Sequence, residues 1–212
     1  MEYKLRLIFW ALMTMLALLL FLITAEYLTF RTDLNFLQKK QDVIHTIWLP
    51  VFYVHVISSM AVIAVGPFQF LKKFRSRYLN WHRLGGKIYA YGILLLAAPS
   101  GLIMAFYAEA GFWSVIGFLC MGILWFVTTL MAVIKIKQRK IEEHRIWMIR
   151  SYALSFAAIT LRLLVPFFSL FIYDENLIII STAWLSWLLN LLIAEGMIFA
   201  IQHKSNKLNI TT

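Results

Sequence analysis

Six long apolar stretches dominate this chain of 212 residues. A transmembrane helix needs about 20 apolar residues to cross a hydrocarbon core of about 30 Å. The stretches lack the period-two alternation of transmembrane β-strands, so each must satisfy its own backbone amides as a helix. They cover residues 7–27, 48–69, 88–107, 112–134, 151–172 and 177–201. The sequence therefore predicts an all-α fold, a six-transmembrane-helix bundle that forms a single integral membrane domain over residues 1–212.

The composition also indicates a membrane protein. Hydrophobic residues make up 62% of the chain and aromatic residues 16%, which is more than a soluble domain buries in one core. The sequence has no Gly-rich phosphate loop, no His-Glu-x-x-His and no Gly-x-Ser-x-Gly, the motifs of many nucleotide-binding and hydrolytic enzymes. No residue is therefore predicted to be catalytic. A single cysteine, Cys120, excludes an internal disulfide.

Lysine and arginine lie mainly on one side of the predicted bundle. Sixteen of the 20 precede the first stretch, follow the sixth, or join the second stretch to the third and the fourth to the fifth. By the positive-inside rule these segments face the cytoplasm, so both termini are predicted to be cytoplasmic. The cations at the two ends of the chain are Lys4, Arg6, Lys204 and Lys207.

The net charge of +10 has two interpretations. A strongly basic protein can bind nucleic acid. Here, however, the cations lie in short loops directly beside apolar stretches, where such residues set topology and contact anionic lipid headgroups. We therefore expect membrane lipids as partners and no binding of nucleic acid. The sequence identifies no small-molecule or protein partner.

Two similar motifs stand at the start of apolar stretches. Residues 82–90 read His-Arg-Leu-Gly-Gly-Lys-Ile-Tyr-Ala, and residues 144–153 read His-Arg-Ile-Trp-Met-Ile-Arg-Ser-Tyr-Ala. Each offers a histidine, an arginine, a second cation and a tyrosine where the chain is predicted to enter the membrane. The similarity has two explanations, which are a parallel repeat that pairs the third and fifth helices and a common way to start a helix at the cytoplasmic face.

Several runs of sequence carry a family resemblance. They are Gly66-Pro67-Phe68-Gln69-Phe70, Trp81 with the first His-Arg motif, Pro99-Ser100-Gly101, the second His-Arg motif and Leu161-Arg162-Leu163. Over roughly residues 45 to 170 the chain resembles an uncharacterised family of bacterial multi-span membrane proteins, the domain of unknown function DUF2306. The resemblance implies a multi-pass protein of the bacterial cytoplasmic (plasma) membrane, without a known activity. Lys87 stands where an arginine is expected, which keeps the charge but gives up bidentate pairing.

Four polar residues fall inside the apolar stretches: His55, Ser100, Arg162 and Asn190. Such groups at bilayer depth normally face a bundle interior or a wet cavity. With a rise of about 1.5 Å per residue the four lie in one mid-membrane layer, so we expect them to form a ligand-binding cavity. Arg162 lacks an acidic neighbour at its depth. It either holds a small anion or a lipid headgroup or bonds to backbone carbonyls of neighbouring helices.

The histidines suggest a cofactor. His82 and His144 can supply imidazole nitrogens to a haem b iron or a metal ion, with Arg83, Arg145 and Arg150 binding the propionates. At most one haem is provided for, because both histidines lie at helix entrances and not deep in facing helices. The other interpretation makes them interfacial residues that bond to neighbouring glutamates or to lipid.

Two functions therefore stand as hypotheses. The first is a b-type haem or metal-binding redox membrane protein. The second is a non-redox binding or transport protein that holds a small anion or a lipid headgroup at Arg162. An absorbance spectrum separates them, because only the first predicts a Soret band.

Overall fold

A computed structural model of the chain describes residues 2–210, and the side chains of all of these except 2–6, 35 and 204–210. Every regular element in this part of the chain is a helix. Six helices are long and apolar enough to cross a membrane: Leu7–Thr29, Trp48–Gln69, Leu79–Ala105, Phe112–Lys137, Ile141–Ser169 and Glu175–His203. The predicted all-α fold with six membrane spans is confirmed.

The cytoplasmic orientation of the termini stays a prediction. The side chains of Lys4, Arg6, Lys204 and Lys207, on which that prediction partly depends, lie outside the described residues. The chain divides into two compact units, Met1–Tyr107 and Ala108–Thr212, each with three spans. The third and fifth helices, which the repeat interpretation pairs, fall in different units.

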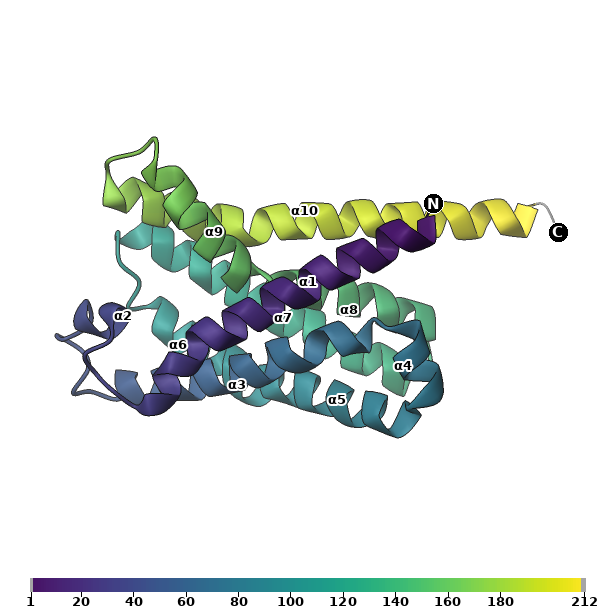
Figure 1. Cartoon of the computed structure of the whole chain (residues 1–212), viewed down its shortest axis with the longest axis horizontal. Coiled ribbons are helices and arrows are strands. Elements are labelled where there is room, and N and C mark those ends of the chain that lie inside the picture. Colours follow the sequence, from purple (N-terminus) through teal and green to yellow (C-terminus); the bar gives the residue numbers. More distant parts are fainter. Residues whose placement is uncertain (1, 211–212) are drawn as a thin grey trace. The chain divides into compact units, whose positions relative to one another are not determined.

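The first unit is a three-span assembly centred on one long helix (Figure 1). Its elements are α1 (Glu2–Thr24), η1 (Ala25–Thr29), α2 (Asn35–Gln38), α3 (Trp48–Gln69), α4 (Lys72–Arg77), α5 (Leu79–Tyr91), η2 (Gly92–Ala97) and α6 (Ala98–Ala105). Helices α5, η2 and α6 run on as a single span, of which η2 is a π-helical turn. Helix α3 packs against α1 on one side and against this span on another. Trp10 Nε1 donates to Pro67 O at 2.9 Å, which ties α1 to the end of α3.

The buried core of the first unit lies where the segment after α1 folds over the start of α3. Leu37, Ile44, Trp48 and Phe52 are buried there, and the rings of Trp48 and Phe52 stack with centroids 5.3 Å apart. Burial of such large rings is a main source of packing energy. The segment between the first two spans is thus folded onto the bundle end.

Outside the spans, this segment also carries local polar contacts. Arg31 donates two hydrogen bonds to Asp33, and this guanidinium holds the pKa of the Asp33 carboxyl below its usual range. Lys40 Nζ donates to Tyr107 O at 2.8 Å, which links the segment to the residues after α6.

The second unit contains α7 (Phe112–Lys137), α8 (Ile141–Ser155), α9 (Ala157–Ser169) and α10 (Glu175–Ile210). Helices α8 and α9 together form one span. The carboxylate of Asp174 accepts hydrogen bonds from the amides of Asn176 and Leu177, so it caps the start of α10. Helix α7 packs against α8 and α10, and α10 also packs against α8 and α9 (Figure 1).

A polar seam joins α7 to α8. Trp125 Nε1 donates to Ser155 Oγ at 2.9 Å, and the hydroxyls of Thr129 and Ser151 lie 2.7 Å apart. Trp125 and Thr129 are four residues apart on α7, as are Ser151 and Ser155 on α8, so each helix contributes two residues of one face. All four side chains are buried. Small side chains and interhelical hydrogen bonds hold helices together in lipid, where burial of apolar surface gives no driving force. The seam fixes the register of α8 on α7.

Two helices begin earlier than the apolar stretches. Helix α5 begins at Leu79 rather than residue 88, and α8 begins at Ile141 rather than residue 151. Both His-Arg motifs therefore lie within helices and not ahead of them. Hydropathy detects only the part of a helix that contacts lipid, whereas lysine, arginine and glutamate continue a helix into the interface at little cost.

Candidate functional site

The first unit brings His55 and Ser100 together around one backbone carbonyl. His55 Nδ1 donates to Ala97 O at 2.8 Å, and Ser100 Oγ lies 3.2 Å from the same oxygen and 2.5 Å from Leu96 O. Pro99 has no amide hydrogen, so regular helical bonding is interrupted at this point, and the π-helical turn η2 directly precedes it. Such turns are frequent at functional sites. The side chains of His55 and Ser100 thus form hydrogen bonds with backbone carbonyls of η2.

Gly101 allows α6 to approach the imidazole of His55. A Cβ atom at this glycine would lie 2.9 Å from His55 Cε1 and 3.1 Å from Nδ1. Such distances are closer than normal van der Waals contact, so only a glycine fits while the ring keeps its hydrogen bond. The glycine of the Pro99-Ser100-Gly101 run therefore allows α6 to pack closely against the ring of His55.

The first His-Arg motif lies on α5 in the same unit. His82 is half-buried and Arg83 is exposed. On another face of the helix, a Cβ atom at Gly85 would lie 2.5 Å from the side-chain nitrogen of Gln69. The glycine lets α5 pack closely on the end of α3. Arg83 remains available on the surface for a negatively charged group.

The second His-Arg motif lies on α8, and its histidine joins the seam with α7. His144 Nδ1 donates to Ala132 O at 2.8 Å, and the half-buried ring lies one turn beyond the Thr129–Ser151 contact. Among the described contacts, the hydrogen bond of His144 goes to the backbone of α7. His82 and His144 thus belong to different units.

Arg150 of this motif is engaged by a carboxylate from the last span. Its Nε and Nη2 atoms donate to the two oxygens of Glu195 at 2.6 and 2.9 Å, a bidentate pair between α8 and α10. The guanidinium also lies 4.7 Å from the ring centroid of Trp147. This fork-to-fork geometry is the strongest form of ion pair. The predicted role of Arg150 in binding a haem propionate competes with this partner.

The other cations at the start of α8 are also matched by glutamates. Arg145 lies 3.7 Å from Glu142, and Glu143 lies 2.5 Å from Lys135 and 3.4 Å from Lys140. The contact between Lys135 and Glu143 ties the end of α7 to the start of α8. Arg145, like Arg150, therefore already has a carboxylate partner within its own unit.

Arg162 and Asn190 both lie in the second unit, but in different surroundings. Asn190 Nδ2 donates to Ala153 O at 3.1 Å, and its side-chain oxygen accepts a hydrogen bond from Thr160 at 3.0 Å. Asn190 therefore bridges α10 to α8 and α9. Arg162 is exposed on α9, and its Nη1 donates to Ala158 O one turn back at 3.0 Å. The structure thus places His55 with Ser100 in one unit, and Arg162 and Asn190 in the other.

These positions restrict the chemistry that the histidines can perform. A carbonyl oxygen can only accept, so Nδ1 of both His55 and His144 carries a hydrogen. In a neutral ring the lone pair then lies on Nε2, and an Nδ1–H held by a carbonyl is the usual arrangement of a metal-binding histidine. Among the described residues, no group of three or more His, Cys, Asp or Glu side chains is arranged to hold a metal ion.

Sequence reasoning missed Glu195 as the partner of Arg150, and it missed the hydroxyl seam. The seam had a detectable signal, because Ser151 and Ser155 are spaced to share a helix face, as are Trp125 and Thr129. The ion pair had none, since its members are 45 residues apart.

Comparison with known proteins identifies the family. The family model described as "Predicted membrane protein (DUF2306)" matches residues 52–198, which include both His-Arg motifs, His55, Arg162 and Glu195. No curated protein and no solved structure matches the chain. Since the match spans more than half of the sequence, the chain belongs to the DUF2306 family of predicted membrane proteins.

Proposed function

We propose that this membrane protein binds a b-type haem through histidine and acts in electron transfer. The observation that supports it most is the hydrogen bond from His144 Nδ1 to Ala132 O at 2.8 Å, because it fixes the ring and directs the Nε2 lone pair away from α7. His144 is the first candidate ligand. The sequence predicts His82 as the other candidate ligand. When bound, the haem supplies reversible one-electron chemistry.

Fewer arginines are available to bind the haem propionates than the sequence predicts. Arg145 and Arg150 already pair with Glu142 and Glu195. Arg83 is exposed on α5 and has no ion pair among the described contacts, so of the three it alone keeps its predicted role without a competing carboxylate. Ligation therefore depends on the histidines, and the arginines contribute less than expected.

An absorbance spectrum of the protein purified from its own membrane tests this proposal. We expect a Soret band that shifts on reduction with dithionite, and we expect His144→Ala to abolish it because the iron loses a ligand. His45→Ala and His203→Ala are matched controls, since both histidines are exposed and neither has an Nδ1 bond to a helix backbone among the described contacts. Both should keep the band.

Two results contradict the proposal. One is a colourless preparation that stays colourless after reconstitution with haemin. The other is a His144→Ala protein that folds and retains the full spectrum. A His82→Ala protein that retains the spectrum while His144→Ala loses it would remove His82 as a ligand.

A second candidate function is binding of a small anion or a lipid headgroup at Arg162. The observation that favours it is the exposure of this guanidinium on α9, within an apolar span. Substitution Arg162→Gln is then expected to remove thermal stabilisation by anionic lipid while the protein still folds in detergent. If the Arg162→Gln protein fails to fold, the main role of Arg162 is structural, through its hydrogen bond to Ala158 O.

We further propose that the protein lies in the bacterial cytoplasmic membrane with both termini in the cytoplasm. The distribution of lysine and arginine between the loops supports this orientation. Single cysteines introduced at residues 72–87 and labelled in intact cells test this orientation. Labelling from outside the cells would contradict the orientation.

A further inference from the structure

The two basic loops of this protein differ in how their charge is balanced. No aspartate or glutamate occurs between Asp42 and Glu109, although this part of the sequence holds six cations. These six, named here the α4 rim, are Lys72, Lys73, Arg75, Arg77, Arg83 and Lys87. None of them forms an ion pair among the described contacts, and all six are exposed.

The loop between α7 and α8 has the opposite character. Four of the six cations in residues 135–150 contact a glutamate of their own unit, through Glu142, Glu143 or Glu195. Topology alone would require only positive charge in both loops. The lack of any acidic residue in the α4 rim therefore indicates a negatively charged group from outside the chain.

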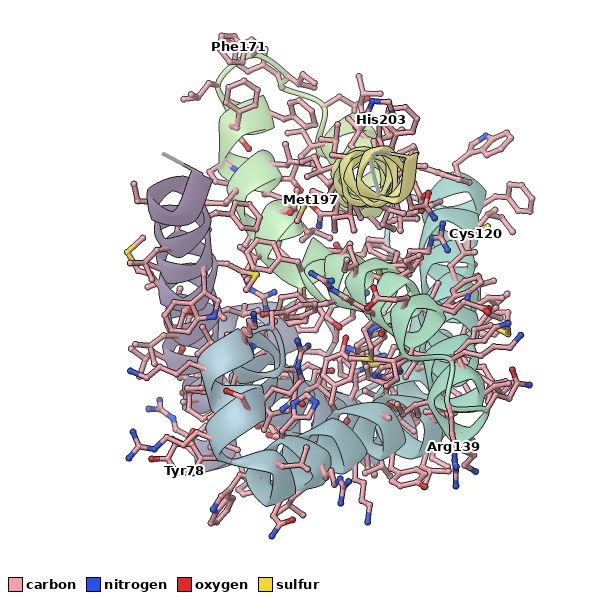
Figure 2. All side chains as sticks on the ribbon, turned by 90° about the vertical axis from the view of Figure 1, so that its right-hand side faces the viewer. Tyr78, Cys120, Arg139, Phe171, Met197 and His203 are labelled. Atoms are coloured by element: carbon pink, nitrogen blue, oxygen red, sulfur yellow. The ribbon has the colours of Figure 1, made fainter. Side chains whose placement is uncertain are left out.

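Local packing holds the cations of α4 outward. Phe74 is the only half-buried residue of this helix, and its ring lies 5.9 Å from the rings of both Phe68 and Tyr78. This aromatic row packs α4 against the residues that end α3 and precede α5, and the lysines and arginines of α4 remain exposed around it. The guanidinium of Arg77 lies 5.6 Å from the Tyr78 ring, and Figure 2 shows Tyr78 at the periphery.

Exposed apolar side chains begin directly beside the rim on α5. Trp81 is 65% exposed, and Leu84, Ile88 and Tyr91 are also exposed at helical spacing along the same face. A tryptophan at such a position marks the level of the membrane interface, and the apolar face below it contacts acyl chains. The cations of the rim and the apolar face thus match the two ends of an amphiphile.

We propose that the α4 rim is a binding surface for anionic phospholipid headgroups. The lysines and arginines contact the phosphates, Trp81 and Tyr78 lie at the glycerol level, and the exposed face of α5 packs against the acyl chains. A soluble acidic protein or a nucleic acid would use the cations but not the apolar face. The proposal does not rest on haem binding, and the variants that test it leave Arg83, the residue shared with the proposed haem site, unchanged.

Lipid titration of the full-length protein in non-ionic detergent tests this inference. Native mass spectrometry with added phosphatidylglycerol or phosphatidylcholine gives the affinity for each lipid. We expect a clear preference for phosphatidylglycerol in the unsubstituted protein. The triple variant Lys73→Gln, Arg75→Gln and Arg77→Gln should lose that affinity by on the order of tenfold or more, since each cation near an anionic surface contributes about fivefold.

A matched control removes the same charge from the other loop. The variant Lys135→Gln, Lys140→Gln and Arg145→Gln should keep the phosphatidylglycerol affinity within about twofold, because each of these cations already contacts a glutamate. Should the α4 triple variant fail to purify, the double variant Arg75→Gln and Arg77→Gln serves in its place, with an expected loss of at least about fivefold.

Three outcomes overturn the inference. They are equal losses in both variants, the absence of a preference for phosphatidylglycerol over phosphatidylcholine, and displacement of bound phosphatidylglycerol by a polyglutamate peptide or a single-stranded oligonucleotide at physiological salt.

Discussion

Replacing Glu195 with glutamine is expected to lower the free energy of unfolding by about 2–3 kcal/mol. The substitution leaves the Arg150 guanidinium, only 24% exposed, without its bidentate partner inside a membrane span. Removal of one member of a fully buried pair costs about 3–5 kcal/mol, and the half-exposed Glu195 side chain reduces the effect here. The loss should appear as a fall of several degrees in the thermal midpoint of the protein in detergent, at roughly 2–4 °C per kcal/mol.

The matched control is Glu142→Gln, which removes a more exposed pair with a longer distance of 3.7 Å. It should cost less than about 1 kcal/mol, as exposed ion pairs usually do. The double variant Arg150→Met with Glu195→Met should recover most of the loss, because the cost comes from an unpaired charge and not from the missing bond. Equal midpoints for Glu195→Gln and Glu142→Gln would show that water or lipid headgroups compensate Arg150 fully.

The sequence was sufficient for the membrane fold and for the family. Apolar length alone predicts all six spans, since the backbone in lipid has few alternatives to a helix. Composition did not locate the true starts of α5 and α8, because the polar first turns of these helices lie outside the apolar stretches. His82 and His144 are the fourth residues of their helices, so they lie in these first turns.

The contacts of the candidate residues were less accessible to sequence reasoning. A proline within a helix, such as Pro99, interrupts regular bonding, but only the packing of α3 on the third span shows that His55 bonds to Ala97 O. Nothing in the sequence pairs Glu195 with Arg150, because their contact depends on the register of α10 against α8. Periodicity identifies faces of helices, and it does not specify which faces meet.

Because His55 packs closely against Gly101, we expect a glycine-to-alanine substitution to lower stability at Gly101 and to raise it at Gly196. Gly101→Ala is expected to destabilise the protein by about 1–2 kcal/mol, the net of overpacking and the helical preference of alanine. The new methyl group would lie 2.9 Å from His55 Cε1. The ring cannot turn aside without losing its 2.8 Å hydrogen bond to Ala97 O. Thermal unfolding in detergent measures the change.

Gly196→Ala is the control, because a Cβ atom there meets no atom within 4 Å and the residue lies inside α10. Alanine should stabilise that helix by about 0.5–1 kcal/mol, since it loses less backbone entropy on folding than glycine does. The two substitutions add the same single methyl group to a helix, so only the surroundings differ. A rise in the midpoint for both variants would mean that the His55 ring moves freely, and that its bond to Ala97 O does not hold it in place.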